Sequence, residues 1–405
     1  MEIRLANVKY SENLGDGLLC ECLERVLSAS SIDVTGCQSI DLAARSGYSS
    51  PRLHRAFLLS LLAALPLWLR NLMLFIPLNV VSRLKWRPHY VKGLDRCDLL
   101  VLGGGNLFID IDLNFPIKIS SIITLASRKN IPIAIYGVGV GRRWSKVGVW
   151  MVNRALRKAN ILYISVRDEA SRVSFAKHFG QCGYIAPDVV LDPGFTVPSV
   201  YNVGASGSAN KRLVGVNICS AEAIRYHSPE KLSDQWLVDW YANLIHSLSS
   251  SGFRVKLFTN GSGDDEGFKG RLGEIIGRSY GNIELVDRPE TPEELVGIIS
   301  TLECVVAFRM HALIAALSLG KSVVALKWDV KVQSIMERLG IEDSFFSVRE
   351  APPSLIVERI NELTCAEGAQ VSADSLVRMA EKDMLSLVSD YPRRLRCGLS
   401  RVEGA

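Results

Sequence analysis

Short β-branched runs alternate with amphipathic segments along most of the chain, and this alternation constrains the fold more than any other feature. The amphipathic segments are 10–17 residues long. Strands that alternate with helices of this length are typical of parallel sheets joined by crossover helices. The pattern predicts an α/β protein with strands at Ile3–Val8, Leu99–Leu102, Pro132–Tyr136, Leu162–Val166, Leu213–Ile218, Val255–Thr259, Ile283–Val286, Val305–Ala307 and Ser322–Leu326.

The 405 residues are enough for two domains. A stretch rich in Gly, Ser and Asn, Phe195–Lys211, has no periodicity and is interpreted as a linker. We therefore expect an N-terminal Rossmann-like domain over residues 1–200, a second Rossmann-like domain over 208–365 and a helical tail over 366–405. Ligands of such sheets bind outside the carboxyl ends of the strands. The active site should thus lie in a cleft across which the two domains face each other.

The cysteines and the N-terminus both bear on the cellular compartment. The nine cysteines are scattered and form no C-x-x-C motif, so neither a disulfide framework nor a zinc knuckle is predicted. Met1 leads directly into an apolar strand, without a basic segment or a small-residue cleavage site. We therefore expect buried thiols in a reducing compartment and a cytoplasmic protein.

The segment between Asp41 and Asp95 is basic and partly apolar. It contains eight basic residues and no acidic residue, and Ala56–Val81 in its middle is nearly all apolar. The longest uncharged run there has 14 residues, whereas a membrane-spanning helix needs roughly 20 apolar residues. We expect residues 42–94 to lie on an anionic membrane surface. The alternatives are a buried helical hairpin with solvated basic flanks, and a true span.

The turn after the first strand contains Asn13, Gly15 and Asp16, and an amphipathic helix follows it. The backbone N–H groups of such a turn can bind an anion. The alternative is an ordinary turn in which Asp16 caps the helix.

Glycines follow the next two predicted strands. Gly103, Gly104 and Gly105 precede Asp110, and a second group of glycines ends at Gly141. Neither group matches the dinucleotide-binding fingerprint or a P-loop, but consecutive glycines allow a ligand to approach the backbone closely. Arg142 and Arg143 follow the second group, either as anion ligands or as ordinary surface charges.

Arg309 and His311 lie between a buried strand and an apolar helix. A pair at this position combines a bidentate anion ligand, a titratable group and the positive end of a helix dipole. Lys331 belongs to a charged cluster after the next strand. Arg167 follows an earlier strand, and a local ion pair with Asp168 would explain it equally well.

Together these segments resemble the polysaccharide pyruvyl transferase family. The resemblance runs in order from about residue 7 to 340. Two features depart from the family pattern: Gly-Arg-Arg stands at 141–143 where Gly-Pro is more usual, and the basic insert at 42–94 is additional. The matching motifs are Asn13-x-Gly15-Asp16, Gly103–Gly105 with Asp110, the glycines at 137–141, Ser165–Ser171, Ala186–Asp188, Arg309-x-His311 and Asp329-x-Lys331.

The resemblance implies a GT-B-like fold and the transfer of a pyruvyl group from phosphoenolpyruvate to two sugar hydroxyls, which forms a cyclic ketal. It implies no metal, and no cofactor beyond the donor. The expected partners are phosphoenolpyruvate and a sugar or lipid-linked oligosaccharide that is a precursor of an exopolysaccharide or cell-surface glycan, with no nucleic acid. The expected location is the cytoplasm or the inner face of the cytoplasmic membrane.

The chemistry assigns roles to the motif residues. The donor carries a carboxylate and a phosphate, so its site needs several cations. His311 is assigned as the acid that protonates the methylene carbon, and either Asp16 or Asp110 as the base for the sugar hydroxyl. The residues expected to bind substrate are Arg309, Lys331, Arg167, Asn13, Gly15, Gly104, Gly105 and Arg142.

Two other functions fit the same sequence. A GT-B glycosyltransferase that uses a nucleotide sugar would share the fold and the cationic helix terminus, but it would bind a nucleoside diphosphate. A scaffold of a glycan-assembly complex would bind the membrane without any turnover.

Overall fold

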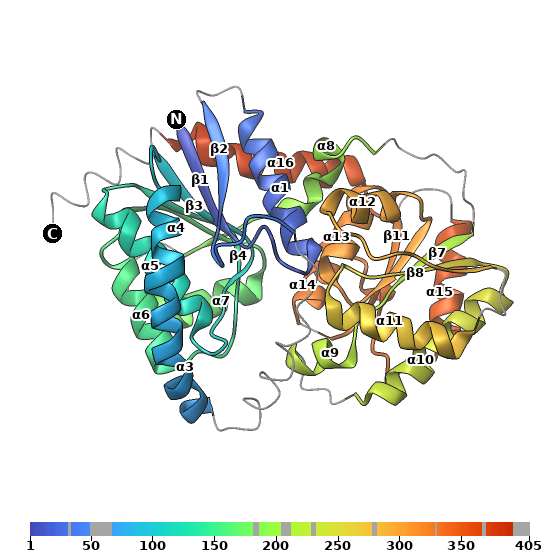
Figure 1. Ribbon diagram of the computed structural model, residues 1–405. Helices are drawn as coiled ribbons and strands as arrows, with labels where there is room; N and C mark the ends of the chain where they lie inside the picture. The colour runs from blue at the N-terminus through green and yellow to red at the C-terminus, as the bar shows by residue number, and fades with distance from the viewer. Residues whose placement is uncertain are drawn as a thin grey trace.

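The computed structural model describes residues 1–30, 34–48, 67–180, 186–203, 212–227, 232–277, 282–328, 330–366 and 370–391. Two six-stranded parallel sheets form the centres of two α/β domains (Figure 1). The predicted fold class is confirmed.

The N-terminal sheet has the strand order β2-β1-β3-β4-β5-β6. The four predicted strands are present, and β2 and β6 are additional. β3 and β4 continue through the glycines that were predicted to form loops, so that prediction was wrong. The strands are β1 (Glu2–Asn7), β2 (Gly36–Asp41), β3 (Leu99–Phe108), β4 (Ile133–Val140), β5 (Ile161–Val166) and β6 (Asp188–Val189).

Helices cover both faces of this sheet, because successive side chains of its strands point to opposite sides. Leu99 and Val101 of β3 pack with α1 (Leu14–Ser28), whereas Leu100 and Leu102 pack in a second core with α5 and its neighbours. The helices of this second side are α4 (Arg87–Gly93), α5 (Asn114–Arg128), α6 (Lys146–Leu156) and α7 (Glu169–Phe179).

The predicted linker is partly helical. The 3₁₀-helix η3 (Pro193–Thr196) and α8 (Val197–Val200) contain its first residues, and Phe195 and Val197 are fully buried. The linker interpretation was therefore wrong for residues 195–200, because apolar side chains here join the core. Residues 204–211 lie outside the described residues.

The C-terminal sheet has the strand order β12-β11-β10-β7-β8-β9 and contains all five predicted strands. Its strands are β7 (Leu213–Asn217), β8 (Arg254–Phe258), β9 (Ile283–Leu285), β10 (Cys304–Ala307), β11 (Ser322–Leu326) and β12 (Phe345–Phe346). Its helical segments are α9 (Ala221–His227), α10 (Asp234–Ser250), α11 (Gly263–Ile276), α12 (Pro292–Ser300), α13 (Met310–Ser318), α14 (Val330–Leu339), η4 (Glu342–Ser344) and α15 (Pro353–Cys365).

The two domains share one apolar core, which runs through α1, η3, α13 and the last helix, α16 (Ala373–Ser389). Figure 1 shows α16 returning across the top of the molecule toward the N-terminal domain. There its Asp383 carboxylate accepts a hydrogen bond from Leu191 N–H at 3.2 Å. The Leu14 N–H, at the start of α1, donates to the carbonyl of Asn260 at 2.8 Å. These contacts hold the carboxyl ends of the two sheets face to face.

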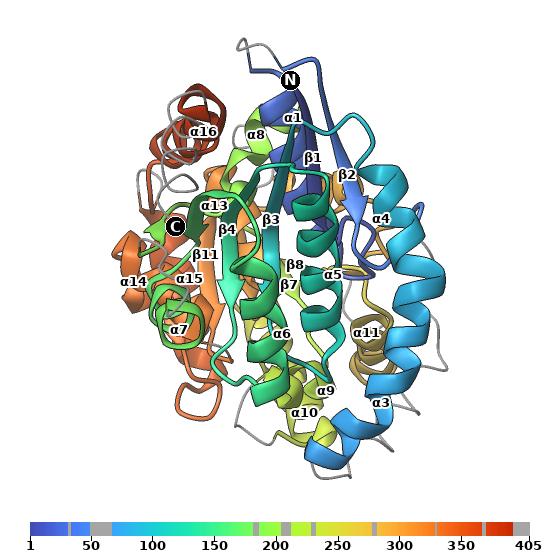
Figure 2. The same ribbon diagram turned by 90° about the vertical axis from the view of Figure 1, so that its left-hand side faces the viewer.

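The basic insert contributes α3 (Leu67–Val81) and a π-helical turn, η1 (Ser82–Trp86), which continues into α4. Figure 2 shows this helix alongside α5. One face is anchored: Trp86 is buried, and Tyr90 donates to the carbonyl of Leu42 at 2.6 Å. The opposite face is exposed at Met73, Ile76, Val80 and Leu84.

The exposed apolar side chains within residues 73–81 do not fit the buried-hairpin alternative there, while residues 49–66 lie outside the described residues. In the part of the chain that the structure describes, no helix is long and apolar enough to cross a bilayer.

Candidate active site

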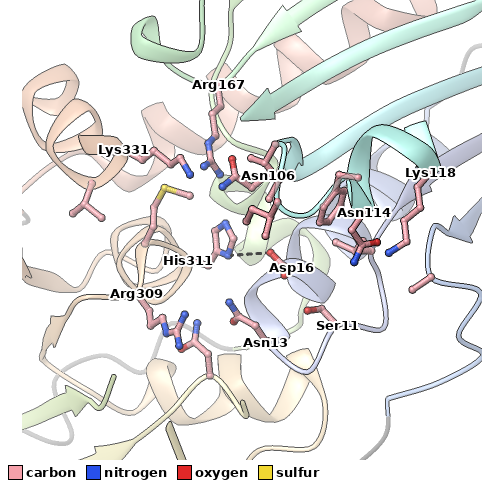
Figure 3. A pocket seen from close by; sticks show the side chains of 18 of the residues that line it. Ser11, Asn13, Asp16, Asn106, Asn114, Lys118, Arg167, Arg309, His311 and Lys331 are labelled. Atoms are coloured by element: carbon pink, nitrogen blue, oxygen red, sulfur yellow. Dashed lines mark ion pairs between the residues drawn. The ribbon is translucent and has the colours of Figure 1, made fainter. Parts of the chain in front are cut away.

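A cavity of about 360 Å³ lies between the domains at the carboxyl ends of the strands. Figure 3 shows Asp16 and His311 near its centre, Arg167 and Lys331 toward one end, and Asn114 and Lys118 toward the other. The lining residues are Val8, Ser11, Asn13, Asp16, Ala43, Arg45, Asn106, Ile109, Ile111, Asn114, Phe115, Lys118 and Arg167 from the N-terminal domain, and Asn260, Arg309, Met310, His311, Trp328, Lys331 and Val332 from the C-terminal domain.

His311 reaches the cavity from the first turn of α13 and packs against α1 of the other domain. A Cβ atom at Gly15 would lie only 2.5 Å from His311 Nδ1, so this contact requires glycine. His311 Nδ1 lies 4.0 Å from Asp16 Oδ1. Its Nε2 atom is buried and has no hydrogen-bond partner among the described residues. The imidazole therefore packs tightly against Gly15, and its Nε2 atom keeps an unused hydrogen-bonding capacity.

The titratable group expected at this helix start, His311, has a strongly shifted pKa. Burial lowers the pKa of His311 to about 3, and the charges of Arg167, Lys331 and Arg309 act in the same direction. A low-dielectric site and neighbouring cations both disfavour a protonated imidazole. His311 is therefore neutral at pH 7.

Arg309 is the N-cap residue of α13 and is held by a buried carboxylate. Its Nε and Nη2 atoms donate to Asp265 Oδ2 at 3.0 and 2.5 Å, and Asp265 Oδ1 accepts from Ser220 N–H at 2.9 Å. The guanidinium also lies over the ring of Trp328. Sequence analysis did not single out Asp265, because it lies in the acidic first turn of α11, 44 residues away.

Arg167 follows β5 and lies between two buried carboxylates. Its Nε is 3.4 Å from Asp168 Oδ2, and its Nη1 is 3.7 Å from Asp192 Oδ2. The two interpretations of Arg167 thus hold together, since it has a local ion pair and also lines the cavity. Burial raises the pKa of Asp192, and the charge of Arg167 opposes this effect. A Cβ atom at Gly139 would lie 2.9 Å from Arg167 Nη2, so this glycine leaves space for the guanidinium.

The rest of the Ser165–Ser171 motif supports this arginine. Asp168 caps α7 by accepting from Ser171 N–H at 2.6 Å. Ser165 accepts from Gly137 N–H at 3.1 Å, and Ser171 accepts from Val140 N–H at 3.0 Å. The side chains of the motif therefore fix the end of β4 beside Arg167.

Asn13 and Asp16 have different roles at the start of α1. Asn13 is the helix cap, because its side chain accepts from Gly15 N–H at 3.2 Å. The alternative in which Asp16 caps the helix was therefore wrong, and its carboxyl group instead lines the cavity. Burial raises the pKa of Asp16, against the lowering effects of Ser11 and Arg167.

Several residues singled out in the sequence lie away from the cavity. Asp110 accepts from both the N–H and the hydroxyl of Ser145, which leaves Asp16 as the carboxylate beside His311. Arg142 is exposed and is not among the lining residues. Gly104 and Gly105 have positive φ angles of 77° and 90° within β3 and pack against α1.

The opposite end of the cavity was not recognised from the sequence. Asn114, Phe115 and Lys118 lie at the start of α5, and the buried Lys118 ammonium is 4.8 Å from the ring centre of Trp86. The only signal was their place after a buried strand, at the beginning of a helix. Within the described ranges, no group of three or more His, Cys, Asp or Glu side chains is arranged to hold a metal ion.

Comparison with known proteins identifies one family and one fold. The family model described as polysaccharide pyruvyl transferase matches residues 13–330, and a search of curated proteins found no match. The UDP-GlcNAc 2-epimerase from Methanocaldococcus jannaschii is 9% identical, with 96% of this chain and 99% of that chain covered and a TM-score of 0.55. MnaA from S. aureus, solved with UDP, is 11% identical, with 98% and 96% covered and a TM-score of 0.51. At such low sequence identities these structural matches show the fold alone. They confirm the GT-B-like arrangement of the two domains.

Proposed function

The chain belongs to the polysaccharide pyruvyl transferase family, and we propose that it transfers the pyruvyl group of phosphoenolpyruvate to two hydroxyls of a sugar in a glycan precursor, forming a cyclic ketal. The observation that carries this proposal is the position of His311 in an interdomain cavity, beside Asp16 and among three cationic side chains.

The cationic end of the cavity suits the donor. Phosphoenolpyruvate carries a carboxylate and a phosphate, and Arg167, Arg309 and Lys331 supply positive charge around His311. Hydrogen bonds between such charged groups are shorter and stronger than neutral ones. Because Asp265 engages Nε and Nη2 of Arg309, this guanidinium keeps a fixed orientation and presents its remaining N–H groups to an anion.

Donor binding should also raise the pKa of His311. The negative charges of phosphoenolpyruvate oppose those of the three cations, and an opposite charge nearby favours the protonated imidazole. We expect His311 to take up a proton when the donor binds, and then to deliver it to the methylene carbon. The methylene becomes a methyl group, and positive charge develops on the carbon that carries the phosphate.

Asp16 then completes the reaction. It accepts the proton of the first sugar hydroxyl while that oxygen bonds to the central carbon, a general-base step. The second hydroxyl oxygen replaces the phosphate and closes the ketal. One of the two hydroxyl protons replaces the proton that His311 gave to the methyl group. The other leaves with the phosphate.

Ligand-dependent thermal stability tests the choice of donor. A ligand that binds only the native state raises stability as RT ln(1 + [L]/Kd). We expect phosphoenolpyruvate to raise the Tm, and UDP and GDP to leave it unchanged. Protection by a nucleoside diphosphate alone would favour the glycosyltransferase alternative and overturn the proposal.

We also propose that the insert holds the enzyme on an anionic membrane surface. The support is its exposed face, which combines apolar residues such as Ile76 and Leu84 with exposed Arg83, Lys85 and Arg87. Apolar residues flanked by cations are typical of helices that lie in the membrane interface.

A further inference from the structure

A second cavity of about 370 Å³ lies at the domain interface, between α7 and α14. Both views of the ribbon show these two helices side by side (Figures 1 and 2). Arg167 is the side chain that it shares with the first cavity. The lining residues are Arg167, Asp168, Glu169, Val189, Leu191, Asp192, Phe195, Ser334, Ile335, Glu337, Arg338 and Leu339.

Three buried polar atoms in this wall lack hydrogen bonds within the described part of the chain: Arg167 Nε, Arg167 Nη1 and Asp192 Oδ2. Asp192 Oδ2 and Arg167 Nη1 lie 3.7 Å apart, beyond hydrogen-bond distance, and neither has a hydrogen-bond partner among the described residues. Asp192 and Arg167 are only 3% and 5% exposed. One atom is an acceptor and the other a donor. A single hydroxyl group, which both donates and accepts, would satisfy the two at once.

The remaining lining has the chemistry of a carbohydrate site. Carboxylates of Asp168, Glu169 and Glu337 lie on the wall together with apolar side chains of Leu191 and Phe195. Carboxylates accept hydrogen bonds from sugar hydroxyls, and apolar side chains cover the C–H faces of the ring. The acidic groups outnumber the arginines here, in contrast to the cationic end of the first cavity, so a neutral ligand fits better than the anionic donor.

We propose that the second cavity is the subsite for the acceptor sugar, with one hydroxyl placed between Asp192 and Arg167. This proposal rests on the proposed function. It gives Arg167 two tasks, because the same guanidinium faces the donor in the first cavity and the acceptor in the second. The reacting hydroxyls must then reach the donor and Asp16 past Arg167, and not from the Lys118 end of the first cavity.

Filling the cavity tests this placement. Ser334 is partly exposed on α14 and lines the second cavity but not the first. A panel of methyl glycosides, titrated calorimetrically into the wild type, supplies the acceptor probe as its tightest-binding member. In Ser334→Trp we expect the dissociation constant of this glycoside to rise about tenfold or more, a loss of about 1.4 kcal/mol or more. The dissociation constant of phosphoenolpyruvate should stay within about twofold, because the indole does not reach the donor end.

Two further variants keep the test decisive. Glu337→Gln, at an exposed rim position, replaces Ser334→Trp if the tryptophan variant does not fold, and it should also weaken acceptor binding alone. Lys118→Gln changes the other end of the first cavity. Acceptor binding that is unchanged in the α14 variants would overturn the proposal. Acceptor binding that is weaker only in Lys118→Gln would overturn it as well. A failure of the proposed function would appear separately, as wild-type enzyme that binds saccharide but not phosphoenolpyruvate.

Discussion

At the scale of single residues, the close contact between Gly15 and His311 leaves no room for a side chain at position 15. In Gly15→Ala the new methyl group would lie 2.5 Å from Nδ1, so the imidazole must move. Displacing His311, the proposed general acid, should lower kcat by up to about 10²–10⁴-fold, the usual contribution of proton transfer. Steady-state kinetics and Tm measure the effect. The matched control is Gly267→Ala on an exposed part of α11, where nothing lies within 4 Å of the added atom; an equal loss of kcat there would contradict this account.

Arg309 gives a second prediction at this scale. The paired hydrogen bonds from Nε and Nη2 to Asp265 orient the guanidinium, and lysine cannot reproduce this orientation. The charge-assisted hydrogen bond that Arg309 is proposed to make to the donor contributes about 1.5–3 kcal/mol. Arg309→Lys should therefore weaken phosphoenolpyruvate binding roughly ten- to a hundredfold, since 1.4 kcal/mol is about a factor of ten. Titration calorimetry measures the dissociation constant, and donor affinity equal to the wild type would remove Arg309 from the donor site.

The pKa of His311 links the site to acid stability. The folded-state pKa is about 3, below the ordinary value of about 6.5, so the unfolded state binds more protons between these values. Stability should fall as pH drops from about 6.5 toward 3. In His311→Gln this contribution disappears, whereas those of Asp16 and Asp192, which act in the opposite direction, remain. The Tm of the variant, measured from pH 7 to 4, should fall less steeply than that of the wild type; parallel curves would contradict the prediction.

His311 and Arg309 could be predicted from the sequence, because an arginine and a histidine two residues apart at a helix start combine an anion ligand with a titratable group. It could not choose between Asp16 and Asp110. That choice depends on Ser145, whose hydrogen bonds to Asp110 occupy one of the two carboxylates. Asp265 and Asp192 were missed because their partners are distant in the chain.

At the scale of elements, strands with mostly apolar sequences were predicted, and β2, β6 and β12 were not. β2, with the sequence GCQSID, is half polar or glycine, and β6 and β12 contain only two residues each. The glycines of β3 appeared to end the strand, but their positive φ angles are accommodated inside the sheet beside Leu19 of α1. Periodicity alone cannot distinguish such a strand from a loop.

The insert gives a prediction at this scale. Each basic residue near an anionic surface contributes about 1 kcal/mol, so replacing Arg83, Lys85 and Arg87 with glutamine should sharply reduce cosedimentation with vesicles that contain phosphatidylserine. Activity on a soluble sugar should remain. A matched triple variant at the C-terminal end of α6, at exposed Arg154, Arg157 and Lys158, should bind as the wild type does. Equal binding by both variants would remove the insert from the membrane contact.

At the scale of the whole molecule, the site exists only because the two domains meet. α1 brings Asp16 and α13 brings His311, and the apolar core shared by these helices fixes their relation. Two α/β domains and a cleft followed from the alternation of strands and helices. The packing of α16 on the N-terminal domain did not, because it depends on contacts between residues such as Leu191 and Asp383, which are 192 positions apart in the sequence.

Mass spectrometry of saccharide acceptors after incubation with phosphoenolpyruvate, together with assay of the phosphate released, tests the central claim most directly. Wild-type enzyme should add one pyruvyl ketal to the acceptor and release one phosphate for each product. His311→Gln should form product about 10²–10⁴-fold more slowly. Transfer of a sugar from a nucleotide sugar, with no pyruvyl product from phosphoenolpyruvate, would contradict the account.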